Sequence, residues 1–209
     1  MRTSLLVCAA VQTAIACGCT SYRAQYNIAL AKVVATDAAG KTLAPGTITA
    51  DPMHGLAYRD GLLGVVWIMG DYDANLSVEN LTGEPIAVVW DRCVYTDVTG
   101  AAHKLASARG DPAQIGQPQA PTAIAPGKVE RRFVKPADYT VRDNDSWRSL
   151  PLLPCCGGSL ESLEEEVAPY VGKSFEFSLA IEKGSEAFEY AFDFVVDGVP
   201  KVRPMKTHF

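Results

Sequence analysis

Two stretches near the C-terminal end of the chain alternate strictly between apolar and polar positions. In "FEFSLAIE" (175–182) the apolar side chains at every second position share one face, and "FEYAFDFVV" (188–196) repeats this pattern. Alternation with a period of two is typical of a β-strand with one buried face. Gly184 and Ser185 lie between the stretches, where a glycine at the first turn position favours a tight hairpin. The sequence therefore predicts an antiparallel hairpin whose aromatic face belongs to the core.

Further strands follow from similar patterns earlier in the chain. We expect a first strand over 26–34, a hairpin that turns at Asp60–Gly61, a second hairpin that turns at Thr82–Gly83, and a strand over 128–135. Because the apolar face of a sheet must be covered by a second layer, several such strands predict an all-β domain. We expect a single antiparallel β-sandwich over 26–199, followed by a C-terminal tail over 200–209.

Two segments lack this alternation. The segment 107–127 is rich in Pro, Gly, Gln and Ala and predicts a long loop, either functional or a crossing between sheets. Within 142–173 we expect one short helix over 159–168, with a capping box formed by Ser162 and Glu165 and an end at Pro169. Its apolar face would consist of Leu160, Leu163 and Val167.

The N-terminal segment "MRTSLLVCAAVQTAIA" has the pattern of a secretory signal peptide. Arg2 provides a positive charge, a mostly apolar run follows, and small residues lead into Cys17 and Cys19. The run is too short for a transmembrane helix, which needs about 20 apolar residues. An ordinary cleaved signal peptide and a Cys-x-Cys metal or redox pair are the alternatives.

A small residue followed directly by cysteine resembles the lipobox of bacterial lipoproteins. The resemblance implies that the cysteine thiol is joined to diacylglycerol and that the chain is cut just before it. Cys19 is the favoured lipidation site, with a signal peptide over 1–18 and a tether over 19–25, and Cys17 is the alternative. Since no Asp follows either cysteine, the resemblance implies the outer membrane, with the side it faces left open.

Composition narrows the range of partners. The 209 residues carry a net charge of −5, and no basic patch stands out beyond Arg131 and Arg132, which argues against nucleic acid. We expect the membrane, through the lipid anchor, and an envelope protein as partners.

Three cysteines remain beyond the signal peptide and the anchor. Outside the cytoplasm thiols tend to pair, so we expect a disulfide between Cys93 and either Cys155 or Cys156. It would close a loop of about 60 residues and contribute about 3–4 kcal/mol. A fourth cysteine, Cys19, would join them if Cys17 carries the lipid. The alternative is a soft-metal site formed by the three thiols and a histidine.

No catalytic motif is present in the sequence. The three histidines, His54, His103 and His208, lie outside any GxSxG, HExxH or phosphate-loop pattern, so we expect no enzyme, no catalytic residue and no cofactor. Trp147 and Arg148 form either an exposed surface for a partner or a lid over the open end of the sandwich.

Four segments together resemble a group of uncharacterised bacterial lipoproteins. They are "SVENLTGEPIAVVWDRCVYTDVTGAAHKL", "TAIAPGKVERRFVKP", "SWRSLPLLP" and "YVGKSFEFSLAIEKGSEAFEYAFDFVV", and the resemblance covers about 73–196. It implies an immunoglobulin-like fold and no activity, and the positions of Cys93, Cys155 and Cys156 lie outside its pattern. We expect a lipid-anchored cell-envelope protein that acts as a non-catalytic interaction module. The alternative is a carrier of a soft metal or small ligand that uses these three cysteines.

Overall fold

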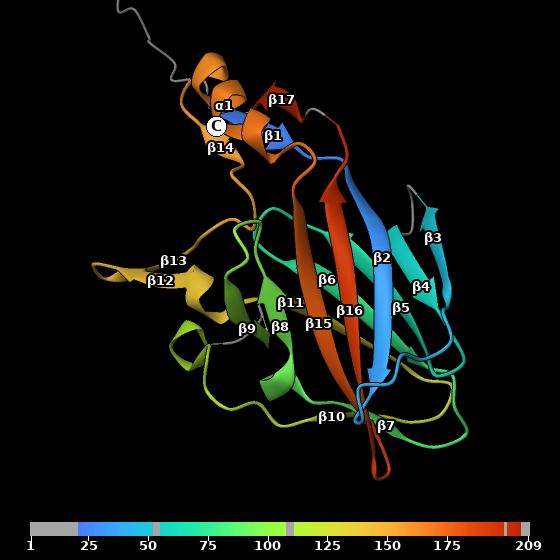
Figure 1. Cartoon of the computed structure of the whole chain (residues 1–209). Helices are drawn as coiled ribbons and strands as arrows, with labels where there is room; N and C mark the ends of the chain where they lie inside the picture. The colour runs from blue at the N-terminus through green and yellow to red at the C-terminus, as the bar shows by residue number, and fades with distance from the viewer. Residues whose placement is uncertain (1–20, 52–54, 108–110, 199, 206–209) are drawn as a thin grey trace, which may run out of the picture.

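The structure is a computed structural model that describes residues 21–51, 55–107, 111–198 and 200–205. Figure 1 shows a twisted body of β-strands with a small sheet and one helix at one end. Every strand pair among these residues is antiparallel. The all-β prediction is confirmed.

The first layer of the body contains the two aromatic strands. β16 lies between β15 and β2, and the other edge of β15 pairs with two short strands, β7 and β8. The strands of this layer are β2 (Ile28–Asp37), β16 (Glu186–Val196), β15 (Ser174–Lys183), β7 (Ile86–Val88), β8 (Val94–Thr96) and β10 (Thr122–Ile124), which pairs with β7.

The second layer continues from the first without a break, because β8 also pairs with β9. Its strands, in spatial order, are β9 (Ala102–Ser107), β11 (Val129–Pro136), β6 (Ala74–Asn80), β5 (Leu63–Met69), β4 (Gly55–Arg59) and β3 (Thr47–Asp51). One hydrogen-bonded sheet therefore folds over to form both layers, and we call this two-layered body the sandwich. Its immunoglobulin-like arrangement stays a prediction.

Aromatic side chains fill the space between the layers. The Trp67 ring lies 4.8 Å from the Phe177 ring and 5.5 Å from the Phe192 ring, measured between centroids. All three side chains are fully buried. The two alternating stretches thus contribute their aromatic face to the core as predicted, because burial of large apolar surface is the main favourable term in folding.

The hairpins predicted from short turns have different outcomes. The turn at Asp60–Gly61 connects the paired strands β4 and β5, and Gly184 connects β15 and β16 with a φ of 58°. The hairpin predicted at Thr82–Gly83 is wrong, since β6 pairs with β5 and β11 whereas β7 pairs with β10 and β15. The chain crosses between layers here because the buried Asn80 side chain donates to the carbonyls of Glu84 and Ile124, both at 2.8 Å.

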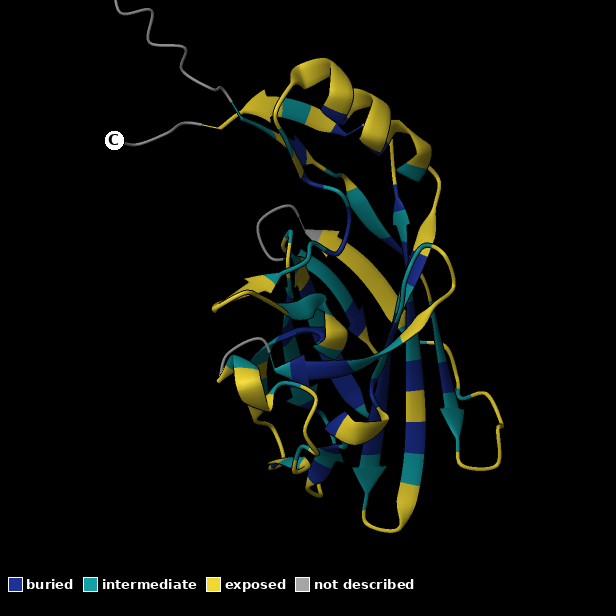
Figure 2. Cartoon of the chain, turned by 90° about the vertical axis from the view of Figure 1, so that its left-hand side faces the viewer, coloured by how far each residue is buried: buried dark blue, intermediate teal, exposed yellow. Residues whose placement is uncertain are grey.

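A small separate sheet lies at one end of the body. Its order is β14 (Cys156–Gly157), β1 (Tyr22–Gln25) and β17 (Lys201–Pro204), and α1 (Leu160–Val167) packs on it. The predicted tether over 19–25 and tail over 200–209 therefore need correction: the described parts of both contain strands that pair with each other. Figure 2 shows exposed residues along the outer side of α1.

The helix is confirmed, but its N-cap is not the predicted one. Ser159 accepts a hydrogen bond from the Ser162 backbone N–H, so Ser159 caps the helix instead of a box of Ser162 and Glu165. Leu163 and Val167 are buried, whereas Leu160 is 41% exposed. The 3-10 turn Ala168–Tyr170 follows at Pro169.

A short hairpin projects from the side of the body (Figure 1). Its strands are β12 (Thr140–Asp143) and β13 (Ser146–Ser149). The lid predicted at Trp147 is wrong, because the Trp147 side chain is 45% exposed on this hairpin. The remaining turns are the 3-10 helices Trp90–Arg92, Pro112–Gln114 and Ala137–Tyr139, and the predicted long loop over 107–127 holds the second of these as well as β10.

The signal peptide and both lipidation candidates, Cys17 and Cys19, lie outside the described residues. Among the residues that are described, no helix has the length and apolar character needed to cross a membrane.

Candidate functional site

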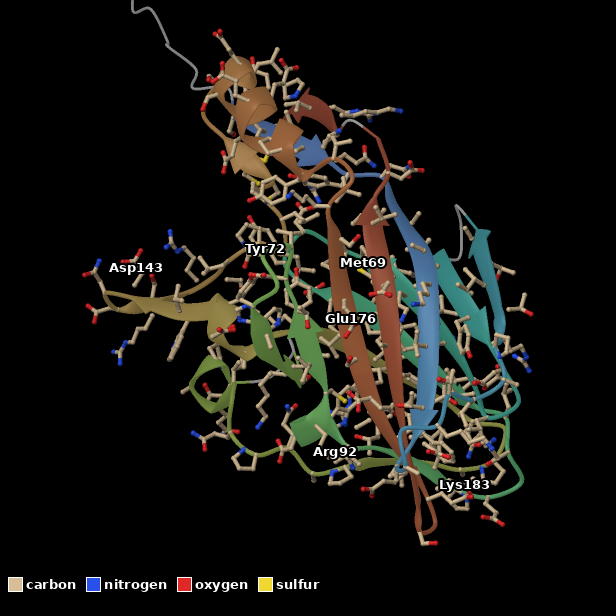
Figure 3. The ribbon with its side chains drawn as sticks, viewed as in Figure 1. Met69, Tyr72, Arg92, Asp143, Glu176 and Lys183 are labelled. Carbon is tan, nitrogen blue, oxygen red and sulfur yellow. The ribbon has the colours of Figure 1, made fainter. Side chains whose placement is uncertain are left out.

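Three segments distant in sequence meet where the small sheet joins the body. The turn between β5 and β6 is held against the segment after β13, because the Leu152 N–H donates to the Asp71 carbonyl at 2.7 Å. β1 joins them, since the Ala24 N–H donates to the Cys155 carbonyl at 2.8 Å. Figure 3 shows Tyr72 at this junction.

Two thiols, a phenol and a carboxylate gather at this junction. The Sγ atoms of Cys155 and Cys156 lie 2.8 Å apart, and Tyr72 Oη lies 3.8 Å from each of them. One carboxylate oxygen of Asp71 and the two sulfur atoms all lie within 4.8 Å of one another. We call Asp71, Tyr72, Cys155 and Cys156 the thiol cluster.

A cation lies beside the thiol cluster. Arg23 Nε is 2.6 Å from Asp71 Oδ2, and this ion pair raises the pKa of the guanidinium. Burial raises the pKa of Cys155 to about 12, and the neighbouring Cys156 thiol adds to this shift. Hydrogen bonding to the two thiols, followed by burial, raises the pKa of Tyr72 above its ordinary value. At neutral pH the Cys155 thiol is therefore protonated.

Cys93 lies apart from the thiol cluster. Its buried Sγ donates to the Val89 carbonyl at 3.3 Å and accepts from the Ala180 N–H at 3.5 Å, and burial raises its pKa to about 11. All three cysteines of the described chain are free, so the expected disulfide between Cys93 and Cys155 or Cys156 is absent. Cys93 directly follows the 3-10 turn Trp90–Arg92 and is buried in the aromatic core cluster, to which neither of the other two cysteines belongs.

The structure changes the set of residues that could bind a soft metal. Asp71 and Tyr72 join Cys155 and Cys156, while Cys93 and His103, the histidine within the described residues, do not. Sequence reasoning missed Asp71 and Tyr72 because they lie more than 80 positions before the two cysteines. Tyr72 and Cys155, for example, are 83 positions apart. The only local signal is the polar turn "GDYD" (70–73) between two apolar strands.

His103 belongs to a different group of side chains. Its Nδ1 lies 2.7 Å from Asp138 Oδ2 and its Nε2 lies 3.4 Å from Asp97 Oδ2. Burial opposes protonation, but the two carboxylates outweigh burial and raise the pKa of His103. This arrangement holds the ring between two acceptors. His54 and His208 lie outside the described residues.

A cavity of about 900 Å³ extends from the thiol cluster between the small sheet and the end of the sandwich. Cys155, Asp71 and Arg23 lie on its wall, and so does Arg203 of β17. Apolar side chains of the sandwich, among them Leu56, Trp67 and Phe175, form the facing wall. Its volume lies within the range of about 300–1,000 Å³ found for small-molecule sites.

The predicted partner surface at Trp147 and Arg148 lies on the projecting hairpin. Trp147 pairs across the hairpin with Arg142, and Arg148 pairs with Val141. Both predicted residues are exposed.

Comparison with known proteins adds no relative to this chain. No protein-family model, no curated protein and no solved structure matches it.

Proposed function

We propose that this protein is a lipid-anchored, non-catalytic protein of the outer membrane that binds a thiophilic metal ion at the thiol cluster. Cys19, or Cys17 in its place, would carry the lipid, and the β domain would be immunoglobulin-like in its arrangement. The observation that carries the metal proposal is the convergence of two thiols and a carboxylate within 4.8 Å.

The donor set favours a zinc-like or softer ion. Thiolates select Zn²⁺ and Cu(I), whereas a carboxylate also suits Zn²⁺. Two atoms that each bind zinc at about 2.0–2.3 Å lie at most about 4.6 Å apart. The donors all lie within 4.8 Å of one another, close to this limit. The two sulfur atoms, 2.8 Å apart, would have to separate to about 3.7 Å to hold a tetrahedral ion.

Charge also balances in the bound state. Two thiolates and the Asp71 carboxylate supply −3, while Arg23 and a divalent cation supply +3. The Tyr72 hydroxyl is placed to donate to either thiolate. Zero net charge lowers the desolvation cost at the buried Cys155 side of the cluster.

Titration of the reduced, full-length protein with Co²⁺ and then Zn²⁺ tests this proposal. We expect a thiolate-to-cobalt absorption band that Zn²⁺ abolishes, with at least about tenfold weaker binding in Cys155→Ser, Cys156→Ser and Asp71→Asn. Cys93→Ala is the matched control, since Cys93 lies in the core, and it should bind as the parent does. Absence of the band in reduced protein, or equal weakening by Cys93→Ala, would overturn the proposal.

A second candidate function rests on the projecting hairpin. Trp147 is 45% exposed, and aromatic and arginine side chains are enriched in the centres of protein interfaces. We propose that Trp147 and Arg148 contact an envelope protein. A photo-crosslinker at position 148 should join one protein of the envelope, and Trp147→Ala should abolish that product without changing the melting temperature. A product that persists in Trp147→Ala would contradict this role.

A further inference from the structure

The small sheet has two chemically different faces. Tyr22, Ala24 and Val202 pack with Leu163 and Val167 of α1 into an apolar cluster. Successive side chains of a strand point to opposite faces, so the intervening residues turn away from the helix. Arg23, Gln25 and Arg203 are among them, and these three line the cavity.

The two arginines lie directly opposite each other. Arg23 of β1 and Arg203 of β17 are Cα partners in the antiparallel register. Like charges in this relationship destabilise a sheet unless a counter-charge is near. Arg23 has Asp71 as its partner, whereas Arg203 has no carboxylate partner in the described part of the chain. Two guanidiniums and one carboxylate leave a charge of +1 on this wall.

The facing wall of the cavity is apolar. It is formed by the open end of the sandwich core, where Ile28, Leu56 and Phe175 lie on the cavity surface. Trp67 also lines the cavity, and its buried indole N–H has no hydrogen-bond partner among the described residues. The cavity therefore combines a cationic wall with an apolar wall.

We propose that this cavity binds a single-chain anionic amphiphile, with the anionic group against Arg203 and the acyl chain along the apolar wall. Guanidinium groups form paired hydrogen bonds with carboxylates and phosphates, which fits either a fatty acid or a lysophospholipid with a phosphate headgroup. The apolar wall accounts for the chain, since a bare anion would leave that surface exposed to water. This inference does not rest on the proposed metal function.

Quenching of tryptophan fluorescence by bromine-labelled amphiphiles tests the proposal in the full-length, delipidated protein. We expect a brominated fatty acid to quench the emission, because Trp67 lines the cavity, and Trp67→Phe to lose most of that quenching. A lysophosphatidic acid arm, measured by displacement of the brominated fatty acid, decides between the two headgroups. A trimethylammonium amphiphile with the same chain is the charge control and should not displace it.

Two variants on β17 separate recognition of the anionic group from nonspecific binding. Arg203→Gln should raise the dissociation constant about tenfold, as expected for loss of one charge-assisted contact. Lys201→Gln is the matched control: Lys201 shares the strand and face of Arg203 but does not line the cavity, and this variant should bind like the parent. Equal effects of the two variants, or equal binding of the cationic amphiphile, would overturn the proposal.

A third variant distinguishes amphiphile binding from the proposed metal binding. Cys156→Ser removes a donor of the thiol cluster that lies outside the cavity wall. We expect it to bind the amphiphile normally even if it binds no metal. Loss of amphiphile binding in Cys156→Ser would show that this binding depends on the thiol cluster, and it would overturn the proposal.

Discussion

The guanidinium of Arg23 and the carboxylate of Asp71 form the ion pair that connects the small sheet to the sandwich. The two groups approach to 2.6 Å, and the Asp71 side chain is 19% exposed. Arg23 belongs to a strand near the N-terminal end of the described chain, and Asp71 belongs to a hairpin turn of the sandwich. The same carboxylate faces the thiols of Cys155 and Cys156, so the contact between the two parts of the fold also builds the thiol cluster.

Detaching α1 should disturb the thiol cluster without unfolding the sandwich. Leu163 is fully buried between α1 and the small sheet. We expect Leu163→Ala to destabilise this end of the molecule by about 2–4 kcal/mol, because it leaves a cavity in a small cluster. Hydrogen exchange of β1 and β17 and the rate of thiol alkylation at Cys155 should both increase. The exposed Leu160→Ala should leave both rates unchanged, and an equal increase there would contradict this account.

The side chain of Asn80 should be among the most important polar groups for stability. It donates to two carbonyls at 2.8 Å, and its Oδ1 accepts from the Thr82 N–H at 2.9 Å. Asn80→Ala leaves the buried Ile124 carbonyl and the partly buried Thr82 N–H without this partner, so we expect a loss of about 2–4 kcal/mol in the free energy of unfolding, measured with urea. Asn27→Ala, at an exposed position, is the control. A loss below about 1 kcal/mol would show that water replaces the amide.

The pair of carboxylates around His103 predicts a specific pH dependence. The folded pKa of His103 is raised, so its contribution to stability is complete below the unfolded value of about 6.5 and is lost as the pH rises through the folded pKa. We expect the parent to exceed His103→Gln in melting temperature most strongly at acidic pH, with the difference shrinking at alkaline pH. Melting curves across this range test the prediction, and a difference that grows with pH would contradict it.

Cys93 should affect stability and leave metal binding unchanged. The side chain is fully buried in the aromatic core, and Cys93→Ala removes one sulfur atom there. We expect a loss of about 1–2 kcal/mol in the free energy of unfolding. Mass spectrometry of the alkylated, unfolded parent should count Cys93 as a free thiol before any reduction. A mass that shows Cys93 bonded to Cys155 or Cys156 would contradict the structure.

The strands were predictable wherever one face is buried along their whole length. β15 and β16 show this best: in β16 the apolar residues at every second position from Phe188 to Val196 are buried, and those between them are partly or fully exposed. The turns at Asp60 and Gly184 were predictable because their conformations favour particular residues. The turn at Thr82–Gly83 has the same local signature, yet no local signal shows that Asn80 anchors it across the two layers.

The sequence by itself determined the all-β class, the hairpins of β4–β5 and β15–β16, and the short helix near Leu163. These depend on alternation and turn chemistry within a few residues. Only the tertiary structure decided that the segments beside Tyr22 and Lys201 pair as strands, and that Asp71 and Tyr72 meet Cys155 and Cys156 while Cys93 stays in the core. Such contacts depend on which surfaces remain uncovered once the sheet has folded over, and that is a property of the whole chain.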